Sequence, residues 1–373
     1  MAATRHTDVI VVGGGVVGLS VAYELARTGR SVRLLERTAT GREASWAGAG
    51  ILPPGSWFSD HPAVEALAAA SRPLHRLWSH RLREQTGIDD ELLESGALYA
   101  ITPDNAATLD AKFQRWATLG LESRRIGAAA AAELAPQLRC GEAYFVPEES
   151  HVRNPRRLAA LAAACRAAGV ALEQDCPATE FDRSGGRVTS VLCGGGAFTA
   201  DAICIAAGAW AGGLLSAVGL DAPTKPIRGQ MLLLRQRGPT LRRVYHEGGH
   251  YLTPRRDGRV LVGSTVEDAG FDKSTRLEDL DALLHFAHRV APSLREASIE
   301  TSWAGLRPAS PDGLPMIGRV PGLENAWVAA GHFRSGLQFA PATAVLLRQL
   351  MGGEPSDIDT TPFSPERFAT AKA

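Results

Sequence analysis

The sequence lacks a net charge and any long apolar run. Its 40 basic and 40 acidic side chains give a formal charge of zero, so no electrostatic argument supports a nucleic-acid or membrane-surface partner. No apolar run reaches the length that a membrane span needs. We therefore expect binding to neither nucleic acid nor membrane, and a small molecule is the expected ligand.

Cysteines are few, and none of them forms a CxxC pair. This spacing indicates neither a zinc site nor a disulfide framework, and it favours a reducing cytoplasm. The length of 373 residues, with 45% hydrophobic and 21% charged residues, is typical of a globular protein of one or two domains, with two favoured. The five cysteines are Cys140, Cys165, Cys176, Cys193 and Cys204.

Residues 8–36 predict a strand, a glycine turn, a helix and a second strand. The apolar run before the turn suits a strand buried on both faces, and Gly29 is a natural end for the helix. A pyrophosphate would then lie on the helix N-terminus. Glu36 ends the second strand, where a carboxylate can accept from an adenosine ribose hydroxyl. The G-x-G-x-x-G positions are filled by Gly13, Gly15 and Gly18.

This pattern alone leaves two alternatives open, a glycine-rich turn without a ligand and a site for NAD. The chain carries 39 glycines, but here the strand, helix, second strand and terminal acid all occur in order. Residues 201–210 predict a further buried strand with a small-residue turn, and 325–343 predict strand, glycine turn and helix. A helix N-terminus at the second segment can face a reduced flavin ring, which favours FAD.

Several segments together resemble the family of FAD enzymes that contains glycine oxidases and D-amino-acid oxidases, and within it the glycine oxidases of thiamine biosynthesis. The resemblance runs from residue 8 to about residue 350. Several such segments in the right order make chance similarity a poor explanation. The segments that carry it are the opening motif and residues 44–51, 251–263, 303–308, 311–318 and 331–336.

The resemblance implies an α/β fold with two domains, a Rossmann-like FAD-binding domain and a discontinuous α+β substrate domain on an antiparallel sheet. Residues 1–85, 146–221 and 301–373 would form the first domain, and 86–145 and 222–300 the second. The residues themselves predict a strand at 94–101 followed by helical segments, a helix that starts at Asn154-Pro155, and a hairpin with an Asp257-Gly258 turn.

Three side chains are candidates for binding a substrate carboxylate. Planar arginine clamps suit this task, because oxidation requires the Cα–H to point at the flavin. From the residues alone, a surface charge or a structural ion pair is the favoured interpretation of Arg307 and of Arg334, and Tyr251 could be an ordinary half-buried strand residue. The resemblance implies that Tyr251 and Arg307 bind the carboxylate and that Arg334 lies beside substrate and flavin.

Two histidines could suggest a general base. However, an amine that binds neutral can pass hydride directly to the flavin, and the resemblance implies no obligatory side-chain base. We therefore interpret His332 as a flavin contact and His250 as structural.

The resemblance also implies a noncovalent FAD, since related sarcosine oxidases use a cysteine late in the chain and no cysteine here follows Cys204. Ala44 departs from the hydroxyl residue common in relatives, so its contact would be through the backbone. The expected cofactor-binding residues are Gly13, Gly15, Val16, Val17, Gly18, Glu36, Arg37, Ala44, Ser45, Ala49, Gly50, Ile51, Ala178, Gly208, His332, Phe333, Arg334, Ser335, Gly336, Leu337 and Gln338.

The implied reaction is oxidative deamination of glycine or another small amino acid, with dioxygen as acceptor and hydrogen peroxide as product. The imine would hydrolyse to an oxo acid and ammonia, or supply thiamine thiazole synthesis. Oxidation of D-amino acids, sarcosine or proline, transfer of electrons to a quinone, and a flavin-binding subunit without turnover are the alternatives. A homotetramer is implied only by analogy.

Overall fold

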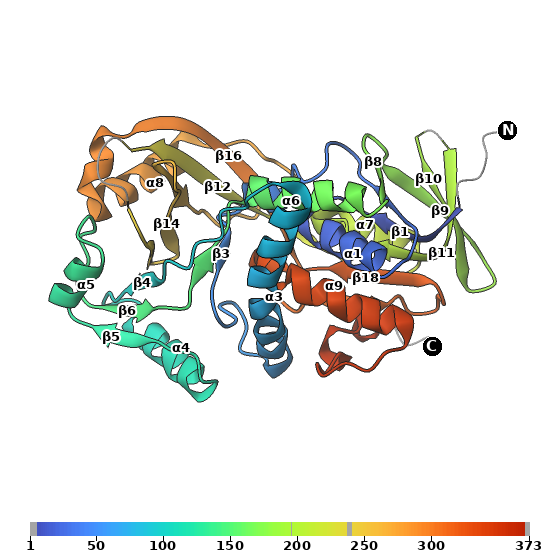
Figure 1. Cartoon of the computed structure of the whole chain (residues 1–373), viewed down its shortest axis with the longest axis horizontal. Coiled ribbons are helices and arrows are strands. Elements are labelled where there is room, and N and C mark those ends of the chain that lie inside the picture. The colour runs from blue at the N-terminus through green and yellow to red at the C-terminus, as the bar shows by residue number, and fades with distance from the viewer. Residues whose placement is uncertain (1–5, 195, 237–240, 370–373) are drawn as a thin grey trace.

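The protein is organised around two eight-stranded sheets, seen in a computed structural model that describes residues 6–194, 196–236 and 241–369 (Figure 1). The first sheet contains β1 (His6–Val12), β2 (Val32–Leu35), β8 (Ala171–Glu173), β9 (Ala178–Ser184), β10 (Arg187–Cys193), β11 (Gly196–Ile205), β17 (Met316–Arg319) and β18 (Ala326–Ala330). Its order is β17-β18-β11-β1-β2-β8, and the β9–β10 hairpin extends from β11. The pairs of β1 with β2 and β11 are parallel.

Strand β1 is apolar on both faces because it separates two cores. Val9 and Val11 belong to one core, and Ile10 and Val12 to the other. Alternate side chains of a strand point to opposite faces, so a central parallel strand covered on both sides needs an unbroken apolar run. The first core is completed by α1 (Val16–Arg27), α3 (Pro62–Thr86), α6 (Asn154–Ala167) and α9 (Gly336–Gly352), and the second by α7 (Ala211–Ala217) and the β9–β10 hairpin.

The second sheet is largely antiparallel. Its strands are β4 (Ala97–Ala100), β5 (Arg124–Ile126), β6 (Ala143–Val146), β12 (Lys225–Arg235), β13 (Val244–Glu247), β14 (His250–Pro254), β15 (Arg259–Gly263) and β16 (Ser298–Ala309). They follow the order β16-β12-β15-β14-β13-β4-β6-β5. Leu252 and Val262 pack into a core with helix α8 (Leu277–Val290), whereas Tyr251 belongs to a separate cluster. The sheet therefore has one face covered by α8 and another face available to line a site.

We propose that the two sheets are the centres of the two predicted domains. The expected boundary between residues 300 and 301 falls inside β16, which pairs with β12 from Ser298 to Ala309. The boundary between 145 and 146 likewise falls inside β6. Because a strand cannot leave its sheet midway, the proposed boundaries move to the ends of these two strands.

The predicted α/β fold is confirmed, and so are the strand–turn–helix–strand start and the hairpin of β14 and β15. Gly29, with φ of 92°, comes directly after Thr28, the C-cap residue of α1. The expectation of only helical segments after the strand at 94–101 was incomplete, because β5 and β6 accompany helices α4 (Ala106–Thr118) and α5 (Ala128–Leu134). Strand β5 has three residues, too few for a recognisable alternation. Within the described residues, no helix combines the length and apolar character needed to cross a membrane.

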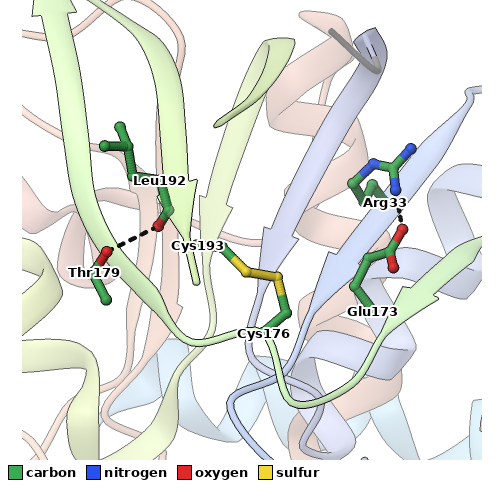
Figure 2. The surroundings of a disulfide bond; sticks show 6 residues. All are labelled: Arg33, Glu173, Cys176, Thr179, Leu192 and Cys193. Carbon is green, nitrogen blue, oxygen red and sulfur yellow. Dashed lines mark hydrogen bonds and ion pairs between the residues drawn. A yellow bond between two sulfur atoms is a disulfide. The ribbon is translucent and has the colours of Figure 1, made fainter. Parts of the chain in front are cut away.

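A disulfide joins Cys176 to Cys193 (Figure 2), so the expectation of no disulfide was wrong. The register of the β9–β10 hairpin places Cys193 opposite Ala178, and the chain entering β9 brings Cys176 alongside, with the Cα atoms 5.5 Å apart. Both cysteines are buried. Sequence spacing does not reveal this pair because the contact depends on hairpin register, and the two positions are separated by 17 in the sequence.

The disulfide predicts a defined thiol count. Cys140, Cys165 and Cys204 are free, so alkylation of unfolded protein should add three groups without reductant and five after reduction, as counted by intact mass. Closing a loop of this length should stabilise the fold by about 3 kcal/mol, and Cys193→Ser should remove that contribution in guanidinium chloride unfolding. Five alkylations without reductant would contradict the assignment.

Candidate active site

A cavity of about 700 Å³ lies between the two sheets and is lined by residues of both. One end is formed by the start of α1, the end of β2 and the turn after β11. The other end is formed by β13, β14 and β16 of the second sheet. The start of α9 and the short helix α2 (Ala44–Ala47) lie along its length. A volume of this size suits a large cofactor together with a small substrate.

The glycine turn brings the backbone of β1 and α1 unusually close together. Gly13 has φ of 111°, and a Cβ atom there would lie 2.5 Å from the carbonyl oxygen of Ala206. A Cβ atom on Gly18 would overlap the carbonyl oxygen of Gly13. Gly15 differs, because a Cβ atom there would meet only Ser45 Oγ, at 3.2 Å. The turn therefore leaves an open cradle at the N-terminus of α1, where a pyrophosphate can approach the backbone.

Glu36, the predicted ribose contact, lines the cavity directly after β2. Its carboxylate is buried, with Oε2 accepting from Gly14 N at 2.7 Å and Oε1 from Thr38 N at 3.1 Å. These backbone donors hold an acidic acceptor at the cavity wall. Ser45 Oγ accepts from Val16 N at 2.9 Å, so the hydroxyl lies at the N-terminus of α1, where a pyrophosphate can approach. These residues fit the adenosine diphosphate half of FAD.

The start of α9 forms the middle of the cavity. Residues 332–338 line it, and the 3-10 turn Phe333–Ser335 precedes the helix. Gln338 Nε2 donates to the carbonyl oxygens of Pro53 and Gly55, which ties the helix start to the segment after β3 (Ile51–Leu52). His332 is buried and its Nε2 lies 3.0 Å from Thr343 Oγ, and burial lowers its pKa to about 4. The imidazole of His332 is therefore neutral near pH 7, which is compatible with its predicted role as a flavin contact.

Arg307 lies at the far end of the cavity, and no acidic side chain of the part of the chain that the structure describes forms an ion pair with it. Its Nη1 donates to the carbonyl oxygens of Arg228 and Thr265, both at 3.1 Å, and its Nη2 donates to Ser264 Oγ at 2.8 Å. Burial lowers the pKa of the guanidinium. Gly229 makes room for it, because a side chain there would overlap the guanidinium.

Arg334 approaches the same region from α9. Its guanidinium lies over the ring of Phe58, 4.4 Å from the ring centre. Burial, followed by repulsion from Arg307, lowers its pKa to about 10. Tyr251 is buried nearby, and its hydroxyl lies 3.4 Å from the sulfur of Met231. Among the described residues, no carboxylate forms an ion pair with Arg307 or Arg334, so this end of the cavity is suited to a small anion.

The structure brings nearly all expected site residues to one cavity. Those that line it include Tyr251, Arg307 and the whole predicted cofactor set except Gly18, which packs against Gly13 instead. Arg37 lies over Trp210 at 3.5 Å and pairs with Glu43 at 2.6 Å. His250, expected to be structural, also lines the cavity.

Sequence reasoning missed an aromatic wall at the substrate end. It consists of Trp57, Tyr99 and His246, with His246 bonded to buried Glu149. The hairpin of β13 and β14 is the sequence feature that could have identified His246 as a site residue. A two-residue Gly248-Gly249 turn places His246 opposite Tyr251 and therefore on the same face.

A dinucleotide cradle joined to an anion-binding pocket defines an oxidoreductase of small anionic substrates. A family model described as "FAD dependent oxidoreductase" matches residues 8–350. The chain belongs to this family, and its cofactor is FAD.

The chain is also similar to individual proteins of known name. The chain is 40% identical over 365 residues to a glycine oxidase of Pseudomonas putida, covering 96% of this chain and 98% of that protein. It superposes on the crystal structure of glycine oxidase from Geobacillus kaustophilus with a TM-score of 0.94 and 33% identity, covering 98% and 100% of the chains. A bifunctional protein ThiO/ThiG of Synechocystis is 32% identical over 379 residues, covering 98% of this chain and 54% of that protein.

The cradle predicts a selective effect of Gly15→Ala. Gly15 has φ of −74°, which alanine adopts without strain, so the apoprotein should fold. The added methyl group would occupy the approach of the pyrophosphate, and FAD affinity should fall by at least about tenfold. Flavin fluorescence titration of apoprotein measures this, and Gly127→Ala, in open space before α5, is the matched control. A variant purified with a full complement of FAD would contradict the assignment.

The lowered pKa of Arg334 predicts a pH limit on anion binding. A guanidinium ordinarily stays charged beyond pH 12, but this one loses its proton as pH rises through about 10. The affinity of the holoenzyme for acetate should therefore weaken above pH 10. Absorbance titration of the bound flavin measures it, and Arg334→Gln should bind acetate more weakly and without this limb. A wild-type affinity that stays flat through pH 11 would contradict it.

Proposed function

We propose that the protein catalyses oxidative deamination of glycine and other small amino acids, with dioxygen as electron acceptor and hydrogen peroxide as product. The observation that carries this proposal is the cluster of Tyr251, Arg307 and Arg334 at the end of the FAD cavity, without an acidic partner among the described residues. The bound flavin supplies the two-electron acceptor for the substrate Cα–H. The side chains of the protein contribute by binding and orienting the amino acid.

The chain orients the substrate through its carboxylate. Arg307 is itself fixed by two carbonyl oxygens and one hydroxyl, so its free N–H groups point in a defined direction without further ordering. Tyr251 can donate its hydroxyl to the same carboxylate, and Arg334 adds charge from the α9 side. Binding the anion relieves the repulsion between the two guanidinium groups.

The N-terminus of α9 contributes a fixed dipole along the cavity. Partial positive charge at a helix start stabilises negative charge that develops on a neighbouring group. We also propose that FAD is held noncovalently, which is supported by the absence of cysteine among the described residues that line the cavity.

A role in thiamine thiazole synthesis is part of the proposal and is supported by the likeness to a bifunctional ThiO/ThiG protein. The product imine would be the compound supplied. A cytoplasmic location is also proposed, and thiol reductants there would open the Cys176–Cys193 disulfide. A homotetramer stays an analogy. D-amino acids, sarcosine and proline remain alternative substrates of the same site.

The direct test is anaerobic bleaching of the bound flavin by a panel of glycine, sarcosine, both alanine enantiomers and D-proline, followed by a peroxide-coupled assay in air. Glycine or another small amino acid should bleach the flavin and yield peroxide. A flavin that bleaches without peroxide would indicate a dehydrogenase with another acceptor. Strong activity towards L-amino acids, or bleaching by no member of the panel, would overturn the proposal.

Removing the carboxylate clamp should abolish most activity. Arg307→Ala should lower kcat/KM for the best substrate by about a hundredfold, because a buried charged partner of the carboxylate is lost. Arg166→Ala, exposed on α6, is the matched control and should leave kcat/KM unchanged. An Arg307→Ala enzyme with wild-type kcat/KM would favour a flavin-binding subunit without its own turnover.

A further inference from the structure

A buried carboxylate–imidazole pair borders the substrate end of the cavity. Glu149 is fully buried, and its Oε1 lies 2.7 Å from His246 Nε2. Its other oxygen, Oε2, accepts from the Tyr99 hydroxyl. The proposed carboxylate clamp uses none of these three side chains, although His246 and Tyr99 line the cavity.

The second sheet places this pair directly beside the carboxylate clamp. His246 in β13 pairs across the strands with Tyr251 in β14, and Tyr99 in β4 pairs with His246. Directly paired residues project from the same face, one strand spacing apart, about 5 Å. The ring of His246 is stacked on Tyr99, with centroids 4.1 Å apart, and meets Tyr251 edge-on at 6.3 Å. His246 is thus one strand away from the residue that donates to the carboxylate.

The hydrogen bonds of Glu149 decide which nitrogen of His246 carries the proton. A carboxylate is only an acceptor, so Nε2 must donate to it, and in the neutral ring Nδ1 then holds a lone pair. Burial and the neighbouring Glu149 raise the pKa of Tyr99 far above its usual value, which keeps the proton on its hydroxyl and makes Tyr99 the second donor.

Nδ1 of His246 remains free to accept a hydrogen bond from a ligand. Among the described residues it has no hydrogen-bond partner, and it is not one of the buried atoms sealed off by protein. The neighbouring Glu247 also lines the cavity, but its oxygens accept from Tyr245 and from Arg289. His246 therefore offers an acceptor where Arg307, Arg334 and Tyr251 offer donors.

An amino acid needs both kinds of group. Its carboxylate accepts from the three donors, whereas its amino group presents N–H groups that need an acceptor once water has left. We propose that His246 Nδ1 accepts a hydrogen bond from the substrate amino group, and that Glu149 fixes the ring tautomer that makes this possible. The proposal rests on the proposed function, and it defines the ligand class as carboxylates with an N–H donor on the α-nitrogen.

Glu149→Gln tests the tautomer with little change in shape. The amide nitrogen of glutamine can donate to His246 Nε2, and its oxygen can accept from Tyr99, so every buried group stays bonded. The proton of His246 then moves to Nδ1, which becomes a donor that faces the substrate N–H. We expect kcat/KM for glycine to fall by about tenfold or more, whereas the Kd of acetate, a carboxylate without an amine, should stay within about twofold of wild type.

His246→Phe is the second variant, because it keeps the aromatic stack and removes the acceptor. It should show the same split between glycine and acetate, measured by turnover and by titration of the bound flavin. His285→Gln, an exposed histidine paired with Asp281, is the matched control and should change neither value. Flavin absorbance and circular dichroism establish that each variant is folded, and if Glu149→Gln does not fold, His246→Phe decides.

Unchanged kcat/KM for glycine in a folded Glu149→Gln or His246→Phe enzyme would overturn this proposal. An equal loss of glycine turnover and acetate affinity would also overturn it, because it would indicate a general distortion of the pocket. Failure of the proposed function is distinct. In that case the wild-type flavin would be bleached by no small amino acid, although acetate would still bind.

Discussion

The close contact between β1 and α1 is the constraint on which the rest of the structure depends. Gly18 allows α1 to pack against the end of the strand, because a Cβ atom there would overlap the carbonyl oxygen of Gly13, and Gly13 allows the turn to pass close to Ala206 after β11. This contact points the N-terminus of α1 into the cavity, where a Cβ atom on Gly15 would meet Ser45 Oγ at 3.2 Å. The cavity around this helix N-terminus is also lined by Glu36 after β2, by Ser45 and by the turn after β11.

At the opposite end of the cavity, two positively charged side chains lie close together, and no carboxylate of the described residues pairs with them. Arg307 and Arg334 are held at one end without a carboxylate partner among residues 6–194, 196–236 and 241–369, and burial lowers the pKa of each. Keeping two cations in such a place is unfavourable unless an anion completes the site. The two arginines therefore favour the binding of a small carboxylate, although they do not stabilise the fold when no anion is bound.

Much of the fold and of the site could be predicted from the chain. The apolar run of β1, the glycine spacing and the terminal Glu36 are local signals, and the structure places each where it was expected. The prediction failed where contacts depend on register. The Cys176–Cys193 bond arises from the pairing of β9 with β10, and short β5 carries too few residues to show a pattern.

The sequence by itself determined the dinucleotide turn and the strand and helix that flank it, whereas the assignment of Tyr251, Arg307 and Arg334 to a carboxylate clamp rested on the family resemblance of their segments. Only the tertiary structure decided that these three meet in one cavity, that His246 stands one strand from Tyr251, and that Glu149 lies buried beneath it. The physical reason is the range of the interactions. Turn geometry and strand burial act between neighbours in sequence, whereas charge, tautomer and cavity depend on groups that are distant in the chain and close only after folding.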